Sequence, residues 1–261
     1  MAADVIEPYY QDEAVTIYNG DSMQIIPQLE NIGAVITDPP YSSGGAHRSD
    51  RTQSTVAKYV NSDTQAYRPE FAGDSRDQRS FMTWCTLWMG ACYNIATPGA
   101  PIVSFIDWRQ LPVLTDAVQA GGWVWRGIAV WDKGFGRPRP GGFSNASEYA
   151  LWGTKGPLEP REVYPPGIFR SSAPKDRQHI TQKPEAVMGW LMQIVPPGAT
   201  ILDPFMGSGT TLKAAKEHGY KAIGIEVDPS FCEIAAKRCA ETITFQHHHE
   251  TEPEQMELFN G

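Results

Sequence analysis

Short apolar runs alternate with amphipathic stretches along most of the chain. Apolar runs typical of strands occupy residues 14–18, 34–37, 102–106, 123–131, 149–152, 200–202 and 222–225. The intervening stretches have helical periodicity and predict helices at residues 22–29, 80–96, 111–120, 184–194, 210–218 and 230–242. In the longest predicted helix we expect one apolar face, made of Trp84, Leu87, Trp88, Ala91 and Ile95. The alternation predicts an α/β fold with a mostly parallel, doubly wound sheet.

Two stretches break this rhythm and are interpreted as insertions. Residues 44–79 are polar and have no sustained periodicity, whereas residues 131–180 are rich in Gly and Pro. Inserted loops carry recognition more often than core elements do, so we take residues 44–79 and 133–180 as candidate recognition segments. The alternative is a surface excursion without a function. We expect one domain over residues 1–245 and a disordered, acidic tail over residues 246–261.

Composition predicts a soluble, cytoplasmic protein. No apolar run approaches the ~18 residues that a membrane span needs. The acidic and polar start of the chain does not have the build of a signal peptide. With 4 Cys in 261 residues the chain is also not a disulfide scaffold of the secreted type.

The charge is unevenly distributed. The formal net charge of −8, from 22 Lys+Arg against 30 Asp+Glu, argues at first against a nucleic-acid partner. Residues 126–183, however, hold ten basic and five acidic residues, which gives this window a charge of +5 and leaves −13 for the rest. The basic window overlaps the second candidate recognition segment, so a polyanionic partner remains compatible with the sequence.

A glycine-rich turn joins a predicted strand to a predicted helix. The strand ends at Asp203, the loop passes through Gly207, Ser208 and Gly209, and the helix begins at Thr210. Glycines let a ligand approach the backbone, and a helix N-terminus offers free N–H groups. The next strand closes in Glu226 about 20 residues later, where a carboxylate would accept hydrogen bonds from a ribose diol. The pattern indicates a nucleoside site, and the alternative is a tight turn capped by small residues.

The type of nucleotide follows from what accompanies the turn. A Gly-Lys-Ser/Thr sequence does not follow it, so the Lys that grips phosphates in a P-loop is missing. Asp203 would place a negative charge at the mouth of the pocket, which repels a pyrophosphate but suits an ammonium or a sulfonium group. S-adenosyl-L-methionine has both cations as well as the ribose, and is therefore the predicted cofactor.

A second motif, Asp38-Pro39-Pro40-Tyr41, follows the apolar strand at residues 34–37. Two successive prolines stiffen the backbone and remove two N–H donors, which leaves carbonyl acceptors beside the Asp38 carboxylate. Acceptors on both N–H bonds of an exocyclic amino group draw its lone pair out of conjugation, and Tyr41 offers a face for a planar base. A base inside a duplex cannot reach such a turn, so base flipping is implied. The alternative is a stiff strand exit.

The order of these motifs resembles that of the β-class amino-group DNA methyltransferases. In that family the Asp/Asn/Ser-Pro-Pro-Tyr block comes first, the target-recognition segment follows, and the cofactor-binding Phe-x-Gly-x-Gly block comes last. Here Asp38–Tyr41 precedes Thr181–Pro184, which precedes Asp203–Thr210. The resemblance covers about residues 15–238 and implies a Rossmann-like methyltransferase fold that uses S-adenosyl-L-methionine.

The resemblance also assigns site residues. It implies catalytic roles for Asp38, Pro39, Pro40 and Tyr41, and a hydrogen bond from the cofactor adenine to Asp21. Thr181, Lys183 and Pro184 would border the methionine end of the cofactor. The other implied cofactor residues are Asp203, Phe205, Gly207, Ser208, Gly209, Thr210 and Glu226.

A further segment resembles the family's Trp-Asn-Lys…Glu-Tyr…Lys pattern. It runs from Val130 through Glu148 and Tyr149 to Lys155, and departs from the pattern at Asp132 and Ser147. The predicted contacts to DNA phosphates are basic residues of this region, namely Lys133, Arg137, Arg139 and Lys155.

The predicted reaction is methylation of a flipped adenine N6 in double-stranded DNA, because family members with Asp at the first catalytic position mostly act on adenine. Alternatives are methylation of cytosine N4, methylation of a glutamine side chain, and an inactive DNA-binding module. We predict no metal site: His247, His248 and His249 lie on the tail, and the cysteines, seven apart in each pair, fit buried thiols. We predict no membrane partner, and the sequence leaves a homodimer open.

Overall fold

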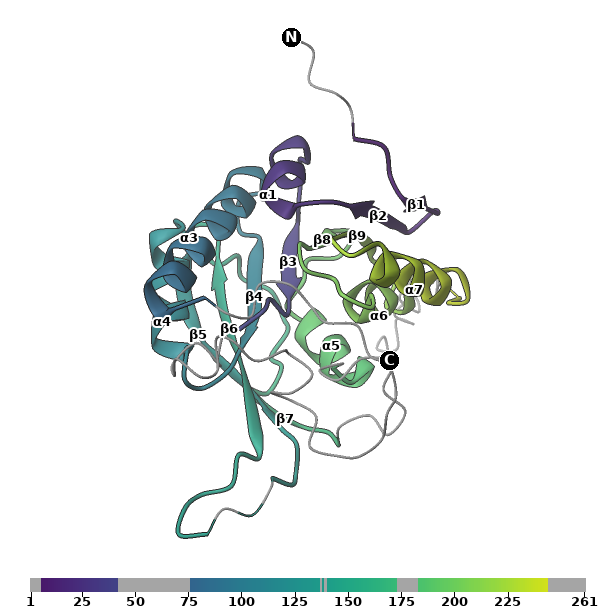
Figure 1. Ribbon diagram of the computed structural model, residues 1–261. Coiled ribbons are helices and arrows are strands. Elements are labelled where there is room, and N and C mark those ends of the chain that lie inside the picture. Colours follow the sequence, from purple (N-terminus) through teal and green to yellow (C-terminus); the bar gives the residue numbers. More distant parts are fainter. Residues whose placement is uncertain (1–5, 42–75, 137, 139, 173–182, 244–261) are drawn as a thin grey trace, which may run out of the picture.

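The computed structural model describes residues 6–41, 76–136, 138, 140–172 and 183–243, and these contain one nine-stranded sheet (Figure 1). The strands are β1 (Tyr10–Gln11), β2 (Val15–Asn19), β3 (Ala34–Thr37), β4 (Pro101–Ile106), β5 (Val124–Asp132), β6 (Ser147–Thr154), β7 (Ile168–Arg170), β8 (Thr200–Asp203) and β9 (Lys221–Glu226). The helices are α1 (Ser22–Ile25), the 3₁₀ turn η1 (Ile26–Gln28), α3 (Gln78–Ile95), α4 (Leu111–Ala120), α5 (Glu185–Met192), α6 (Thr210–Glu217) and α7 (Pro229–Ala240).

The sheet is doubly wound, as the sequence predicts. Its strand order is β1-β2-β9-β8-β3-β4-β6-β5-β7, and the neighbours from β2 to β4 in this order are all parallel. Strand β6 is antiparallel to both β4 and β5, and the two short strands β1 and β7, which the apolar pattern did not predict, form the edges. From β3 the chain crosses to β4 on one side, whereas from β8 it crosses to β9 on the other. The connections therefore diverge between β3 and β8, where ligands bind in folds of this kind.

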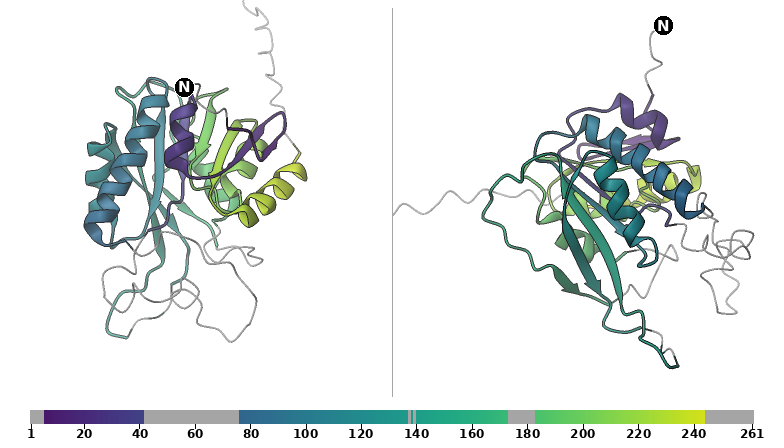
Figure 2. Two further views of the ribbon diagram at one scale, coloured as in Figure 1. Left: turned by 45° about the horizontal axis from the view of Figure 1, so that its top comes forward. Right: turned by 90° about the vertical axis from the view of Figure 1, so that its left-hand side faces the viewer.

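Helices cover both faces of the sheet (Figures 1 and 2). One apolar cluster buries side chains of α1, α3 and α4 against the sheet, and a second buries side chains of α5, α6 and α7 on the other face. Within the described part of the chain, none of the helices is long and apolar enough to cross a membrane.

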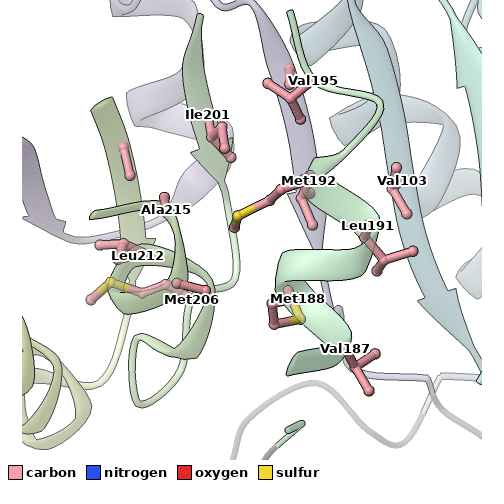
Figure 3. Close-up of a cluster of buried hydrophobic side chains, with 14 of the residues drawn as sticks. Val103, Val187, Met188, Leu191, Met192, Val195, Ile201, Met206, Leu212 and Ala215 are labelled. Atoms are coloured by element: carbon pink, nitrogen blue, oxygen red, sulfur yellow. The ribbon is translucent and has the colours of Figure 1, made fainter. Parts of the chain in front are cut away.

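Helix α5 is held by apolar contacts along its length. Val187, Met188, Leu191 and Met192 are all buried. Figure 3 shows Leu191 beside Val103 of β4, while Met192 projects toward Ile201 of β8. Burial of several large apolar side chains fixes a helix firmly, because each contributes about 1.5–3 kcal/mol. The first residue of α5 is therefore held in a defined place at the carboxyl edge of the sheet.

The buried face of α3 differs from the predicted one. The structure buries Phe81, Cys85, Trp88, Met89 and Cys92, which follow each other at spacings of four, three, one and three residues. Of the predicted face, only Trp88 lies in this stripe, and Leu87 is 55% exposed. The predicted face left out both cysteines, which the structure buries as small apolar residues together with Phe81 and Met89.

Strands β5 and β6 continue into a hairpin that projects beyond the carboxyl edge of the sheet (Figures 1 and 2). The pairing extends past Asp132 and Ser147 to a hydrogen bond from the Lys133 N–H to the Ala146 carbonyl at 2.8 Å. Phe135 and Phe143, near the tip, are exposed. The second candidate recognition segment thus contains this hairpin, β6 and β7, whereas most of the first segment lies outside the described residues.

Lys155, a predicted contact to DNA phosphates, lies at the opposite edge of the sheet from this hairpin, and this position argues against that assignment. It directly follows β6, whose last residue, Thr154, pairs with Pro101 at the start of β4. Its ammonium donates hydrogen bonds to the carbonyls of Tyr93 and Ala96, both at 2.7 Å. These carbonyls belong to the C-terminal turn of α3, where a cation also interacts favourably with the helix dipole. Lys155 caps a helix.

Replacing Lys155 by Met should therefore affect stability and leave the affinity for duplex DNA within twofold of the wild type. The variant loses two charge-assisted hydrogen bonds, and we expect a loss of about 2 kcal/mol in the free energy of unfolding. Urea denaturation and a DNA-binding titration measure the two quantities. Lys221→Met, at an exposed position on the same edge, is the control and should cost less than about 0.5 kcal/mol. A large loss of DNA affinity at unchanged stability would instead support the predicted contact of Lys155 with DNA phosphates.

Candidate active site

The carboxyl ends of the central strands bring the two sequence motifs together. Asp38 directly follows β3, while Asp203 and Glu226 are the last residues of β8 and β9. Because β3, β8 and β9 are parallel neighbours, all three side chains lie at one edge of the sheet, next to the switch point.

The Asp38-Pro39-Pro40-Tyr41 turn is closed by its own side chains. The Tyr41 hydroxyl donates a hydrogen bond to one oxygen of the Asp38 carboxylate. The other oxygen of Asp38 accepts a hydrogen bond from the ammonium of Lys183, which also donates to the Tyr41 hydroxyl at 3.0 Å. The Tyr41 hydroxyl and the Lys183 ammonium therefore fix the orientation of the Asp38 carboxylate, whose side chain retains 24% exposure.

Lys183 is the buried cation of the site. Its side chain is 5% exposed and forms a second ion pair with Glu148 of β6 at 3.3 Å. The ammonium also lies 4.8 Å from the ring centroid of Phe105, within the range of a cation–π interaction. On the far side, Glu148 accepts a hydrogen bond from Lys133 at 3.3 Å. The charges alternate in sign along Asp38, Lys183, Glu148 and Lys133, so each of the buried charges has a partner.

Burial and pairing both shift the pKa values of these groups, and for the three charged side chains the two effects act in opposite senses. Burial raises the pKa of Asp38, and the ammonium of Lys183 counteracts part of that rise. Burial and the nearby carboxylate of Asp38 raise the pKa of Tyr41 well above 10, so the hydroxyl stays protonated. For Lys183, burial disfavours the charged form, yet Asp38 and Glu148 outweigh it and raise the pKa. For Glu148, burial opposes ionisation, but Lys183 and Lys133 lower the pKa.

The placement of Lys183 adds to what the sequence suggests. The motif resemblance puts it beside the cofactor, whereas the structure places its ammonium on the Asp38 carboxylate. Pro184 is the N-cap of α5, with an extended backbone at φ −62° and ψ 138°, which turns the chain from Lys183 into the helix. Thr181 lies outside the described residues.

The glycine-rich turn is organised by the Asp203 carboxylate. Asp203 is 2% exposed and accepts hydrogen bonds from Thr37 Oγ1 at 2.7 Å, Thr211 Oγ1 at 2.5 Å and the Phe205 N–H at 3.1 Å. The structure therefore does not present the open charge that the sequence suggested for the mouth of a pocket. The carboxylate ties the end of β3 to the turn and to α6.

Two glycines of the turn have left-handed backbone conformations. At Gly209, with φ +78°, an added Cβ would lie 2.7 Å from the Cβ of Ala235 on α7, so only glycine lets the helix approach this closely. At Gly207, with φ +49°, an added Cβ would meet nothing within 4 Å. One side of the turn thus packs against α7, and the other faces open space.

Glu226 is held by the backbone of the turn. Its two carboxylate oxygens accept hydrogen bonds from the Gly207 N–H at 3.1 Å and from the Asp228 N–H at 2.9 Å. Burial raises its pKa, which these N–H groups partly oppose. Each carboxylate oxygen has two lone pairs, so both keep capacity to accept from a diol.

Two further predicted cofactor residues have structural contacts. Asp21 is the N-cap of α1 and accepts a hydrogen bond from the Met23 N–H at 2.9 Å. Phe205 packs between α3 and the turn, with ring centroids 5.0 Å from Trp84 and 5.3 Å from Trp88. Both lie at the carboxyl edge of the sheet, and their contacts with the cofactor stay predictions.

Of the two predicted DNA contacts that the structure describes, Lys133 lies near the site and Lys155 does not. Lys133 pairs with Glu148 at 3.3 Å at the base of the projecting hairpin. Arg137 and Arg139 lie outside the described residues. Asp132, one of the two departures from the family pattern, accepts hydrogen bonds from the Gly134 N–H and from Arg170 of β7 at 2.8 Å, and both lower its pKa.

Two residues that organise the site, Glu148 and Arg238, were not identified from the sequence. Glu148 enters the sequence prediction only through the family resemblance, although a carboxylate next to an apolar strand run is a signal for a buried ion pair. Arg238, on α7, donates hydrogen bonds to the carbonyl and hydroxyl of Ser208 and to the hydroxyl of Thr210. No local sequence pattern predicts this role of Arg238, because Ser208 and Thr210 lie about 30 residues away along the chain. Over the described residues there is also no cluster of three His, Cys, Asp or Glu that could hold a metal ion.

The buried Asp203 gives a testable dependence of stability on pH. Burial raises its pKa from 3.8 to about 6, although Thr211 and Thr37 oppose this. The native state then holds a proton that the unfolded state has released, so stability falls as the pH rises from about 4 to 6, by about 3 kcal/mol from this group.

Asp203→Asn should lack this component. Urea denaturation of both proteins at pH 4 and pH 7 gives the difference in their free energies of unfolding. We expect that difference to shift by about 3 kcal/mol in favour of the variant at the higher pH. If the difference between the two free energies of unfolding is the same at pH 4 and pH 7, Asp203 does not contribute the expected pH dependence of stability.

Comparison with known proteins identifies relatives of this arrangement. Residues 32–163 and 157–237 match the DNA methylase family of N6 and N4 amino-group enzymes. The type II methyltransferase M.ScaI of Streptomyces caespitosus is 23% identical, over 89% of this chain and 83% of its own. The putative methylase YubD of Escherichia coli K12 is 26% identical, over 85% of this chain and 88% of its own.

Solved structures agree in fold. The complex of M1.HpyAVI with S-adenosylmethionine is 25% identical, with a TM-score of 0.59 over 86% of this chain and 99% of that one. The cytosine-N4-specific PvuII DNA methyltransferase is 16% identical, with a TM-score of 0.68 over 89% and 88%. The turn after β3, the glycine-rich turn after β8 and a family match from residue 32 to residue 237 lead to one conclusion: this chain belongs to the DNA methylase family and is an amino-group DNA methyltransferase.

Proposed function

We propose that this methyltransferase transfers a methyl group from S-adenosyl-L-methionine to the exocyclic N6 of a flipped adenine in double-stranded DNA. The observation that carries the proposal is the Asp38 carboxylate, held at the switch point by Tyr41 and Lys183, beside the glycine-rich turn. That position puts an acceptor for an amino group next to a turn suited to a nucleoside.

The residues present fit the cofactor. Glu226 retains lone pairs for the ribose hydroxyls, and the open side of Gly207 lets a ligand approach the backbone. When bound, S-adenosyl-L-methionine supplies the methyl group on a positively charged sulfur. The M1.HpyAVI complex, in which the same molecule is named, supports this assignment.

The chain's own residues position and polarise the amino group. The Asp38 carboxylate and the Pro39 carbonyl would each accept a hydrogen bond from one N–H of the amino group. These two hydrogen bonds draw the nitrogen lone pair out of conjugation and toward the methyl group. Lys183 keeps Asp38 charged and oriented despite burial. The nitrogen loses one proton after the transfer, and that proton leaves to solvent. Catalysis of this kind rests on positioning and electrostatics.

Contact with DNA would come from the same edge of the sheet. The hairpin between β5 and β6 projects beyond that edge, and its residues 133–146 carry Lys133, Arg137 and Arg139 without an acidic residue. Such a segment favours phosphate contacts, and these weaken steeply with salt. The acidic N-terminal and C-terminal parts of the chain need not approach the duplex.

The choice between adenine and cytosine depends on one residue. Asp38 at the first position of the catalytic turn favours adenine, following the family resemblance. The PvuII enzyme, which shares the fold, is named as cytosine-N4-specific, and this keeps cytosine N4 as the second candidate.

Identification of the methylated nucleoside tests the proposal directly. DNA incubated with the enzyme and labelled cofactor is digested to nucleosides and analysed by mass spectrometry. We expect N6-methyladenine. N4-methylcytosine would select the second candidate, and label in protein instead of DNA would overturn both.

Asp38→Ala should then lower the rate of transfer at least about a hundredfold, because it removes a preorganised acceptor, while calorimetric affinity for the cofactor stays within about threefold. Asp116→Ala, at an exposed position on α4, is the matched control and should behave like the wild type. Transfer by Asp38→Ala at the wild-type rate would exclude the proposed catalytic role.

A further inference from the structure

Arg238 links the two halves of the site and has no role in the reaction described above. It lies near the end of α7, and its side chain is only 10% exposed. A buried guanidinium must be paired to offset its desolvation, so its partners show what it organises.

One nitrogen of the guanidinium binds the glycine-rich turn. Nη1 donates to the Ser208 carbonyl at 2.6 Å, and it lies 3.3 Å from both the Ser208 and Thr210 hydroxyls. The contact of Gly209 with Ala235, one turn earlier on α7, brings the helix and the turn together at the same place. Arg238 therefore fixes the backbone on which the cofactor is proposed to lie.

The other nitrogen binds the start of α5. Nη2 donates to the Glu185 carboxylate at 3.3 Å, and the second oxygen of Glu185 accepts from Lys213 of α6 at 2.7 Å. Glu185 is the first residue of α5 and stands two positions after Lys183, with the rigid Pro184 between them. Lys183 in turn binds Asp38. An unbroken series of polar contacts and rigid backbone thus runs from the glycine-rich turn to the catalytic turn.

We propose that Arg238 and Glu185 are positioning residues that couple occupancy of the cofactor turn to the orientation of Lys183 and Asp38, and so to DNA binding. The planar fork of arginine can hold two partners in fixed directions, which a lysine ammonium does not do. A ligand that orders Ser208 and Thr210 would act through Arg238 on Glu185, at the start of α5. The proposal rests on the function proposed above.

Such coupling is measured as a change in one ligand's affinity caused by the other. The affinity for duplex DNA is determined with and without S-adenosylhomocysteine, which lacks the methyl group and does not react. For the wild type we expect this compound to tighten DNA binding at least about fivefold. In Glu185→Ala the effect should fall to less than about twofold, while the affinity for S-adenosylhomocysteine alone changes by no more than about threefold. Lys213 keeps its second partner, Glu217, at 3.0 Å.

Two more variants complete the experiment. Arg238→Lys keeps the charge but not the fork, and should lose the coupling and also bind S-adenosylhomocysteine more weakly. Glu233→Ala removes a carboxylate of the same type from an exposed pair with Lys237 on α7, and should keep the coupling. Thermal unfolding confirms that each variant is folded at the assay temperature.

The outcomes separate this inference from the proposed function. A wild type that binds neither ligand would overturn the proposed function and the coupling with it. A wild type that binds both ligands without coupling, or variants that couple as strongly as the wild type, would overturn the role of Arg238 and Glu185 alone.

Discussion

The site depends on one buried ammonium that lies between two carboxylates. Lys183 is surrounded by Asp38, Glu148, the Tyr41 hydroxyl and the Phe105 ring, and these come from β4, β6 and the turn that follows β3. A charge this deeply buried is stable only if each neighbour is in place, because an unpaired buried ion costs several kcal/mol. The requirement fixes the start of α5 against the sheet and turns Asp38 toward the switch point.

The fold supplies the setting for that interaction. Parallel strands bring their carboxyl ends to one edge, and the crossovers from β3 and β8 diverge there to form a switch point. On one side of the switch point is the turn with Asp38, and on the other are the glycine-rich turn and Glu226. Asp203 joins the sides, because its carboxylate accepts from Thr37 of β3 and from Thr211 of α6. The apolar packing of α5 then holds Lys183 in reach of Asp38 (Figure 3).

Local sequence patterns predicted most of the fold and the two motifs, whereas long-range side-chain contacts lay beyond them. Strand and helix periodicity located the elements, because it reflects burial within each element. The same periodicity predicted the wrong buried face for α3, because the prediction counted Leu87 as apolar and left out Cys85 and Cys92. Lys155 has a positive charge in a basic segment, yet it binds the end of α3. Charge in a sequence does not disclose which partner a folded chain will bring to it, and the same holds for Arg238.

The pH dependence of methyl transfer in Lys183→Met tests the central role of the buried ammonium most directly. Burial raises the pKa of Asp38, and Lys183 holds that rise in check, so removing the ammonium must raise the pKa further. With single-turnover rates measured on the same duplex, the acidic limb of the profile should move up by at least about one pH unit relative to the wild type. A folded variant whose acidic limb stays in place would contradict the account, because Asp38 would then not depend on Lys183 for its charge.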